Sequence, residues 1–446
     1  LAAGPAAAEM TQPVTEVWSV GAQPKLDGWW ADRAALDVTA SLWWLDPDAR
    51  DAGGPATPVE ALRTAPGWLV LAAPGNGSQS LITVHGRARP AIAVNGVALP
   101  GQAPLLPALG DADLLLADGA ADDLPGRLRL DLRRAQSGSA GARLAGAGEF
   151  AAGGFGSRRV LGRLDLPLAA GVRVALGGQL HHDLGWLHNV TTGERLNRSQ
   201  RAGLSAAVDL DLAPGLHWAL SASYHRTQVG NLPASACDPG APTRCDGRFT
   251  ASPATTRLAF DAPGLWGPIS ADLARQPLGQ RADLQLYASD ITWESGRFSL
   301  ALHNGFARQT GRLGLDLAGT ALVARTTADR QQHRLALTAD FNVLRLGLEA
   351  GVDDAGETRL AADRAAGQII ADRRISQQHN ARHIAARASW QATGRLELAG
   401  SLRLTDTDVT LAVADRRPAC SPCLAAPGPS RQQAQLVTGD ASAGLA

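Results

Sequence analysis

The stretch LSAAVDLDLAPGLHWALSASYH, residues 204–225, decides the fold class, because apolar residues recur at every second position on both sides of a Pro-Gly turn. A period of two places successive side chains on opposite faces of a β-strand. One face then carries Leu, Val, Trp and Tyr, and the other carries Ser, Asp and His. The stretch therefore predicts two antiparallel strands joined by the short connection at 212–215.

The same alternation recurs from about residue 138 onward, at 159–168, 334–341, 344–349 and 396–405. The segments run about 9–12 residues, the length that a tilted strand needs to cross a bilayer. Connections are expected to alternate in length, with a minimal turn at 212–215 and long polar loops at 226–251 and 351–380.

The polar face distinguishes two kinds of sheet. Alternation alone also fits a soluble β-sandwich, which hides its apolar face. Arg159, Arg163 and Asp165, however, place charge at successive positions on one face, as the wall of a wet channel would. We therefore predict an antiparallel transmembrane β-barrel, with a thin aromatic belt carried mainly by Trp because the chain has 11 Trp and 2 Tyr.

Composition removes several other classes of protein. The 446 residues include 42 Lys+Arg and 42 Asp+Glu, so no basic field argues for nucleic acid. The 49 Gly and 26 Pro favour short strands and turns over long helices. No run of about 20 apolar residues predicts a membrane-spanning helix, but barrels need no such run.

Residues before about 136 have a different pattern, with compact apolar runs at 68–72, 81–86 and 91–101 broken by Gly and Pro. Asn95-Gly96 between apolar residues predicts a tight hairpin. We predict a leader or signal remnant at 1–13, a small mixed α/β domain at 14–135, and the barrel at 136–446.

The four cysteines form two close pairs in polar, Pro-rich segments: Cys237 with Cys245, and Cys420 with Cys423. This placement predicts local disulfides in an oxidising compartment. A zinc site at Cys420 and Cys423 would need two further ligands, and no second half with suitable spacing is found.

None of the candidate catalytic or metal-binding motifs in the sequence has the context that such a site needs. The glycines at 146–148 match a dinucleotide-binding pattern only loosely, without a βαβ context. His181 and His182 are adjacent, so on a strand they point to opposite faces and do not form a metal site. We expect no enzyme activity, no cofactor and no bound metal.

Four passages resemble the TonB-dependent outer-membrane receptors, in which a plug domain fills a β-barrel. VTEVWSV (14–20) is similar to the box that such receptors offer to TonB, and SQSLITVHGRARPAIAVNGVALPG (78–101) to the plug motif. GRLRLDLRR (126–134) sits where the plug leads into the barrel. Residues 158–210, with the loop NVTTGERLN and Trp186 as an interface anchor, resemble the second to fourth barrel strands.

The resemblance implies specific roles for these positions. The TonB box comprises Thr15, Glu16, Val17, Trp18, Ser19 and Val20, and the plug motif comprises His85, Gly86, Asn95 and Gly96. The family closes its barrel with about 22 strands, whereas the chain has about 12 candidates. We therefore expect the plug and about half a barrel, or a small barrel that closes early.

The function implied is energy-coupled import of a scarce ligand, with an iron–siderophore complex as the expected cargo. The location implied is the bacterial outer membrane, and the partners are outer-membrane lipid and TonB with its inner-membrane energising complex. Arginines of the outer loops are candidates for binding the charged ligand: Arg226, Arg244, Arg248, Arg373 and Arg374. A passive porin, a non-functional truncated receptor and a soluble secreted β-protein are the alternatives.

Overall fold

The computed structural model of the chain describes residues 41–45, 68–71, 81–84, 87–88, 91–100, 112–118, 129–134, 144–185, 187–188, 195–196, 198–230, 235–237, 245–249, 279–316, 320–365, 368–393, 396–416 and 430–445. The chain divides into two compact units, Leu1–Val38 and Thr39–Ala446, and every described residue belongs to the second. Regular structure in these residues is β-strand apart from one 3-10 turn, η3 (Gly154–Gly156). The predicted mainly-β class is confirmed.

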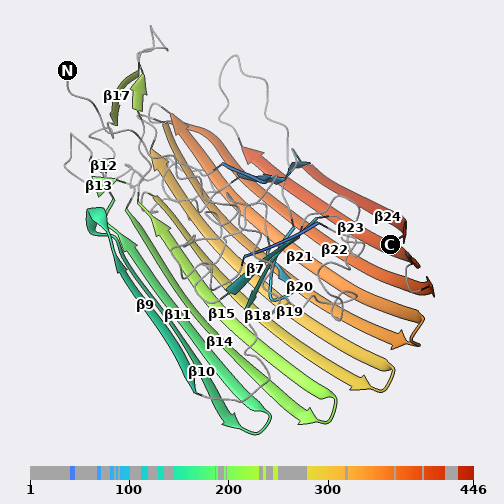
Figure 1. The fold of residues 1–446 in the computed structure, drawn as a ribbon. Coiled ribbons are helices and arrows are strands. Elements are labelled where there is room, and N and C mark those ends of the chain that lie inside the picture. The colour runs from blue at the N-terminus through green and yellow to red at the C-terminus, as the bar shows by residue number, and fades with distance from the viewer. Residues whose placement is uncertain are drawn as a thin grey trace, which may run out of the picture. The chain divides into compact units, whose positions relative to one another are not determined.

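Twelve strands form one antiparallel sheet in which every strand pairs with its neighbours in chain order (Figure 1). This number agrees with the predicted count of barrel strands. The sheet runs from β9 at one edge to β24 at the other. Its strands are β9 (Ala145–Ala152), β10 (Arg158–Ala169), β11 (Val172–Asp183), β14 (Ser199–Ala213), β15 (Leu216–Val229), β18 (Gly279–Ser295), β19 (Phe298–Asp316), β20 (Thr320–Asp340), β21 (Leu344–Ala365), β22 (Gln368–Thr393), β23 (Leu396–Arg416) and β24 (Ser430–Leu445).

Connections between these strands differ at the two ends of the sheet. At the short-turn end, adjacent strands are joined by two or three residues, as at 170–171, 214–215, 296–297 and 341–343. At the other end, which we call the long-loop end, the connections 184–198 and 230–278 are long, whereas 317–319 and 366–367 are as short as the turns. The long connections are the ones with further secondary structure. These contain two small hairpins, β12 (Leu187–His188) with β13 (Arg195–Leu196) and β16 (Ser235–Cys237) with β17 (Cys245–Phe249). The predicted alternation of short and long connections is confirmed at these positions.

The predicted long loop at 351–380 is wrong. Residues 344–365 and 368–393 are β21 and β22, which remain paired as far as Ala365 opposite Gln368. The later strands have 16–26 residues, well above the 9–12 predicted. Residues 353–359 of β21 and 376–380 of β22 are mainly polar on both faces. Their hydropathy therefore resembles that of a loop, although main-chain pairing continues.

Strands before the large sheet form two small sheets of their own. One has the order β1-β7-β8-β5-β6 and the other β2-β3-β4. Their bounds are β1 (Ser41–Leu45), β2 (Trp68–Leu71), β3 (Leu81–Val84), β4 (Arg87–Ala88), β5 (Ala91–Val94), β6 (Val97–Ala98), β7 (Ala112–Asp118) and β8 (Arg129–Arg134). The pair β5–β8 is parallel, and the other pairs are antiparallel. The helical part predicted for this region lies outside the described residues.

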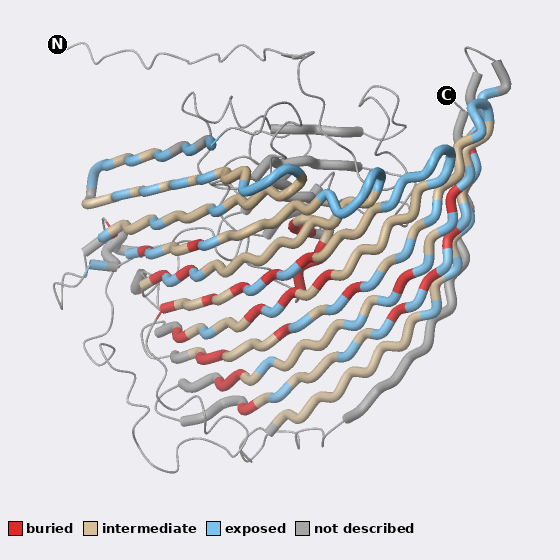
Figure 2. The backbone as a smooth tube through the Cα atoms, turned by 90° about the horizontal axis from the view of Figure 1, so that it is seen from below, coloured by how far each residue is buried: buried red, intermediate tan, exposed pale blue. Residues whose placement is uncertain are grey.

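Burial alternates from residue to residue along parts of several strands of the large sheet, so its two faces differ in exposure (Figure 2). We call the face that carries Gly305 and Gln332 the inner face, because it contacts β6, and the opposite one the outer face. Several large apolar side chains on the outer face are more than half exposed, including Leu180 (61 %), Leu204 (67 %) and Ile384 (65 %). The predicted alternation is confirmed, and exposure on this scale calls for a non-aqueous neighbour.

Candidate functional site

The hairpin formed by β5 and β6 turns at Asn95 and Gly96, as the sequence predicts. Both residues have positive φ, 49° and 78°, which defines a type I′ turn. Glycine tolerates this conformation without steric cost, and asparagine is among the side chains that adopt it most often. The residues that follow the turn are buried, with Val97 1 % and Leu99 5 % exposed.

The hairpin tip lies directly against the inner face of β19. A Cβ added to Gly96 would lie 3.0 Å from Cε1 of His303. A Cβ added to Gly305 would lie 2.8 Å from Cγ2 of Val97, closer than real Cβ atoms approach. These two glycines therefore allow the backbones of the hairpin and the sheet to come together, and a larger side chain at either position would push them apart.

A buried hydrogen bond connects the hairpin to the sheet. The backbone N–H of Ala98 donates to Oε1 of Gln332 at 2.8 Å, and Gln332 is 1 % exposed. The amide of Gln332 donates in turn to Oδ2 of Asp353 at 3.2 Å. Arg330 completes the chain by donating Nε to Oδ1 of Asp353 at 2.8 Å and Nη2 to Oδ2. We call Gln332, Asp353 and Arg330 the hairpin anchor.

Two further polar pairs lie on the inner face beside the anchor. Nδ1 of His303 lies 2.5 Å from Oδ1 of Asp290. On β21 and β22, Nε2 of His383 lies 2.9 Å from Oε1 of Glu349, whose other oxygen lies 3.6 Å from Nη2 of Arg387. Paired charges of this kind tolerate partial burial, whereas single ones are costly to bury. The inner face thus carries paired polar groups beside the buried side chains of Leu284 and Leu286. Within the described residues, Nε2 of His303 is buried without a hydrogen-bond partner.

One inner-face contact requires glycine at position 351. The ring of His383 lies across Gly351 on the neighbouring strand, so that a Cβ at residue 351 would be 2.3 Å from Cε1 of the ring. His383 is 8 % exposed. Gly351 therefore leaves the room in which the His383–Glu349 contact forms.

Aromatic residues mark the outer face near the short-turn end: Trp218, Trp293, Phe298, Phe341 and Trp390. The rings of Phe298 and Phe341 meet edge to face at 6.3 Å, and Nε1 of Trp218 donates to Oγ of Ser289 at 3.0 Å. Amphipathic rings favour the membrane interface. Trp carries most of this belt, as predicted, while Trp186 lies outside the described residues.

The predicted site residues lie in several different places. The TonB box at 14–20, His85, Gly86, Arg244, Cys420 and Cys423 are outside the described residues. Arg248 is in β17, and its side chain is not described. Cys237 and Cys245 are directly opposite each other on β16 and β17, which suits the predicted disulfide.

The prediction that Arg226, Arg373 and Arg374 lie in loops is wrong. Arg226 is in β15, and the other two are in β22. Arg226 points to the outer face, where its Nε donates to Asp283 at 2.6 Å. Parity along β22 places Arg373 on the inner face and Arg374 on the outer face. Charge in these segments resembled that of loops because the strands extend beyond their apolar parts.

Sequence reasoning missed the hairpin anchor and His303. Arg330, Gln332 and Arg334 alternate along β20, which is a detectable signal of a polar face. Nothing in the sequence shows which of them meets residue 98, because that contact joins residues 234 positions apart.

Two further observations concern metal sites and membrane-spanning helices. Within the described residues, no group of three or more His, Cys, Asp or Glu side chains is placed to hold a metal ion. No helix in that part of the chain is long and apolar enough to cross a membrane.

Comparison with known proteins identifies the fold. No family model matches the chain, and no curated protein does. Solved structures do match. The ferric yersiniabactin uptake receptor FyuA from Yersinia pestis superimposes with a TM-score of 0.71 at 13 % identity, covering 91 % of this chain. The siderophore receptor PiuA from Acinetobacter baumannii gives 0.64 at 12 % identity and 92 % coverage. The alcaligin outer-membrane receptor FauA from Bordetella pertussis gives 0.60 at 12 % and 92 %.

The fold is therefore that of the outer-membrane siderophore receptors, and the predicted resemblance is confirmed at the level of the fold. The chain spans 61 %, 63 % and 60 % of the lengths of these three receptors. Its twelve-stranded sheet matches part of their β-barrel and agrees with the predicted partial barrel.

Proposed function

We propose that the chain belongs to a TonB-dependent receptor that imports a scarce ligand across the bacterial outer membrane. The observation that carries the proposal is the contrast between the two faces of one sheet. The outer face exposes leucines and aromatic residues, whereas the inner face carries paired polar groups and packs against a buried hairpin. A sheet in a bilayer satisfies its main chain internally and presents apolar side chains to lipid.

In this proposal residues 14–135 are the plug and residues 136–446 are the barrel wall. The β5–β6 hairpin is the described point where the plug meets the wall, through the hairpin anchor and the close contacts at Gly96 and Gly305. Such a contact closes the passage at rest. A pull on the N-terminal segment would have to loosen this contact before the passage opens. The described contact contains few polar bonds, so few would have to break.

TonB is the proposed partner, and it binds residues 14–20. An extended segment can add as a strand to the edge of a partner's sheet, where main-chain hydrogen bonds supply the grip. Thr15, Val17 and Val20 give the segment the β-branched character that suits this mode.

The proposed cargo is an iron–siderophore complex, the kind of ligand named for FyuA and PiuA. Multiply charged chelates are well bound by arginine. Arg373 lies on the inner face and is the best-placed of the predicted ligand residues. Arg226 is on the outer face and already bonded to Asp283, which supports a different role for it.

The test of TonB coupling is capture of the purified chain by a periplasmic TonB domain. Val17→Pro removes a main-chain donor and fixes φ, so it should abolish capture as deletion of 14–20 does. Val17→Ala is the matched control, because it keeps the main chain intact and should retain capture. Equal capture of the proline, alanine and deletion forms would contradict the assignment of residues 14–20.

A passive pore is the competing function, and a liposome-swelling assay separates the two. The buried hairpin favours a closed passage, so the chain in liposomes should not admit small sugars. Free permeation of small sugars would support the passive pore and would contradict the assignment of residues 14–135 as a plug.

A further inference from the structure

The outer face changes character towards the long-loop end of β15 and β18. Its apolar part ends in an aromatic row formed by Tyr287 and Phe306, which are paired in register and have ring centroids 6.0 Å apart. Tyr224 lies one outer-face row further towards the long-loop end, opposite Gln285. Beyond Tyr224 the outer-face residues of β15 are Arg226 and Gln228, and beyond Tyr287 those of β18 include Asp283 and Arg281. The charged zone thus begins directly at the border of the apolar zone.

Three arginines lie side by side across this zone. Arg281 is paired in register with Arg312 on β19, and Arg312 is paired with Arg325 on β20. Directly opposite residues in antiparallel strands share a face and have Cβ atoms about 5 Å apart. Like charges in such positions destabilise a sheet.

Further arginines flank this row. Arg226 is one outer-face row closer to the apolar zone, and Arg308 is two rows closer. We call Arg226, Arg281, Arg308, Arg312 and Arg325 the outer arginine cluster. Asp283 and Asp329 are the carboxylates interspersed among them in these rows. Five arginines against two aspartates leave a surplus of three positive charges.

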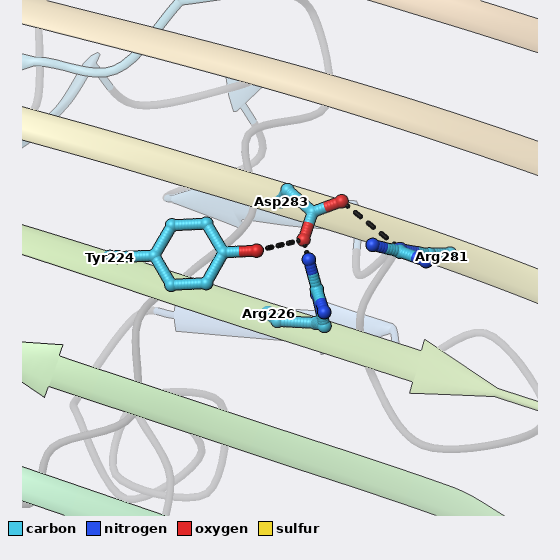
Figure 3. A network of polar contacts seen from close by, with 4 residues as sticks. All are labelled: Tyr224, Arg226, Arg281 and Asp283. Carbon is cyan, nitrogen blue, oxygen red and sulfur yellow. Dashed lines mark hydrogen bonds and ion pairs between the residues drawn. The ribbon is translucent and has the colours of Figure 1, made fainter.

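The carboxylates in the described residues do not neutralise these extra positive charges. Asp283 accepts hydrogen bonds from the Tyr224 hydroxyl at 2.6 Å, from Arg226 at 2.6 Å and from Arg281 at 3.1 Å (Figure 3). Its acceptor capacity is therefore shared among three donors. Arg308, Arg312 and Arg325 form no ion pair with another residue in the described part of the chain. Arg308 and Arg312 are exposed.

Between the arginine rows the side chains are short and carry hydroxyl groups. Thr310 and Thr327 are opposite each other in the row that contains Arg226 and Asp283. They separate Arg312 and Arg325 from Arg308 and Asp329 along β19 and β20. Threonine hydroxyls donate hydrogen bonds and occupy little space, so a small anion fits above them.

We propose that the outer arginine cluster binds the phosphate groups of a membrane-lipid headgroup. Guanidinium groups bind phosphate with paired hydrogen bonds and strong charge assistance. The headgroup layer begins where the hydrocarbon ends, and the cluster starts at the aromatic row that closes the apolar zone. Phosphate bridging Arg281, Arg312 and Arg325 removes their mutual repulsion. This inference rests on the proposed function, because it requires the sheet to be inserted in a membrane.

The test uses the full chain in detergent micelles, titrated with diphosphoryl lipid A and with the same lipid stripped of its phosphates, and followed by native mass spectrometry. The double variant Arg312→Gln/Arg325→Gln keeps the Arg281–Asp283 pair. We expect its affinity for the phosphorylated lipid to fall at least about tenfold, because two charge-assisted contacts are lost. Affinity for the stripped lipid should not change.

The control is Arg158→Gln/Arg382→Gln. It removes two exposed outer-face arginines that have no arginine opposite them on a neighbouring strand. This variant should bind the phosphorylated lipid as the parent chain does. Equal losses in both variants would mean a diffuse charge effect and would overturn the site.

A second measurement separates a binding role from a structural one. Without lipid, the cluster variant should melt at the same temperature as the parent or higher, because repulsion is relieved. Addition of phosphorylated lipid should raise the melting temperature of the parent more than that of the variant. A variant that melts lower without lipid and gains as much from it would overturn the proposal.

Two further outcomes identify what has failed. If inorganic phosphate displaces the lipid at equal concentration, the site binds free anions and the lipid assignment is overturned. Flotation of the chain with phosphatidylcholine vesicles tests insertion by itself. A chain that does not float contradicts the proposed function, whereas one that floats but shows no effect of the cluster variant contradicts only this inference.

Discussion

The two faces of β21 differ in chemistry although a single strand supplies both. Its inner face has Glu349, Gly351 and Asp353, each in a specific contact with β22, with β20 or with a ring that lies over it. Its outer face has Leu346 and Leu348, which are 40 % and 56 % exposed. On β21 the inner positions named here depend on which partner they meet, whereas Leu346 and Leu348 depend mainly on the surrounding medium.

Substitutions on the two faces should therefore destabilise the protein for different reasons. On the outer face, a charged residue should lower the free energy of unfolding because it loses contact with water. The loss should be largest near the middle of the apolar zone. On the inner face, a substitution matters only where it breaks a particular contact. Adjacent residues of the same type on opposite faces therefore make matched experiments.

The largest expected effect comes from Ala206→Arg compared with Ala207→Arg. Ala206 lies on the outer face between Leu176 and Ala222, and Ala207 lies on the inner face between Ala175 and Ser221. A charge on the lipid side near the middle of the apolar zone should cost about 2–4 kcal/mol. Denaturant unfolding in lipid vesicles measures the difference. Equal destabilisation of both variants would contradict the assignment of lipid and water to these faces.

A smaller, local effect is expected for Gln332→Ala compared with Gln331→Ala. Gln332 accepts the bond from the Ala98 N–H, while Gln331 points to the outer face. Loss of the acceptor leaves a buried N–H unsatisfied, which should cost about 1–3 kcal/mol. Hydrogen exchange at Ala98 should accelerate accordingly in the Gln332 variant alone. Unchanged exchange would show that the hairpin does not depend on its anchor.

The smallest effect is expected for Gly351→Ala. The new Cβ displaces the His383 ring and loosens its contact with Glu349, at a cost of about 1 kcal/mol by overpacking. Gly356→Ala on the same strand is the control, because its Cβ would meet Asp329 at an ordinary 3.5 Å. Thermal unfolding should separate the two variants. A control that is as destabilised as Gly351→Ala would attribute the loss to the β21 backbone instead.

Sequence reasoning succeeded where a signal is local. The period of two gave the strands at 204–225 and assigned Leu204, Val208 and Leu220 to one face, and Asn95-Gly96 gave the hairpin. It failed where hydropathy alone had to separate strand from loop, as at 351–380 and for Arg226 and Arg373. The strand segments around those residues are mainly polar on both faces, so the alternation of apolar and polar residues disappears while main-chain pairing continues.

The amino-acid sequence by itself determined that this protein is a sheet of alternating strands, that short turns fall at 95–96 and 212–215, and which side chains share the apolar face. Those properties depend on neighbours one or two residues apart along the chain. Only the tertiary structure decided that Ala98 meets Gln332 and that Arg281, Arg312 and Arg325 form a single row. Strand register brings together residues far apart in the chain, and their partners follow from the pairing of whole strands.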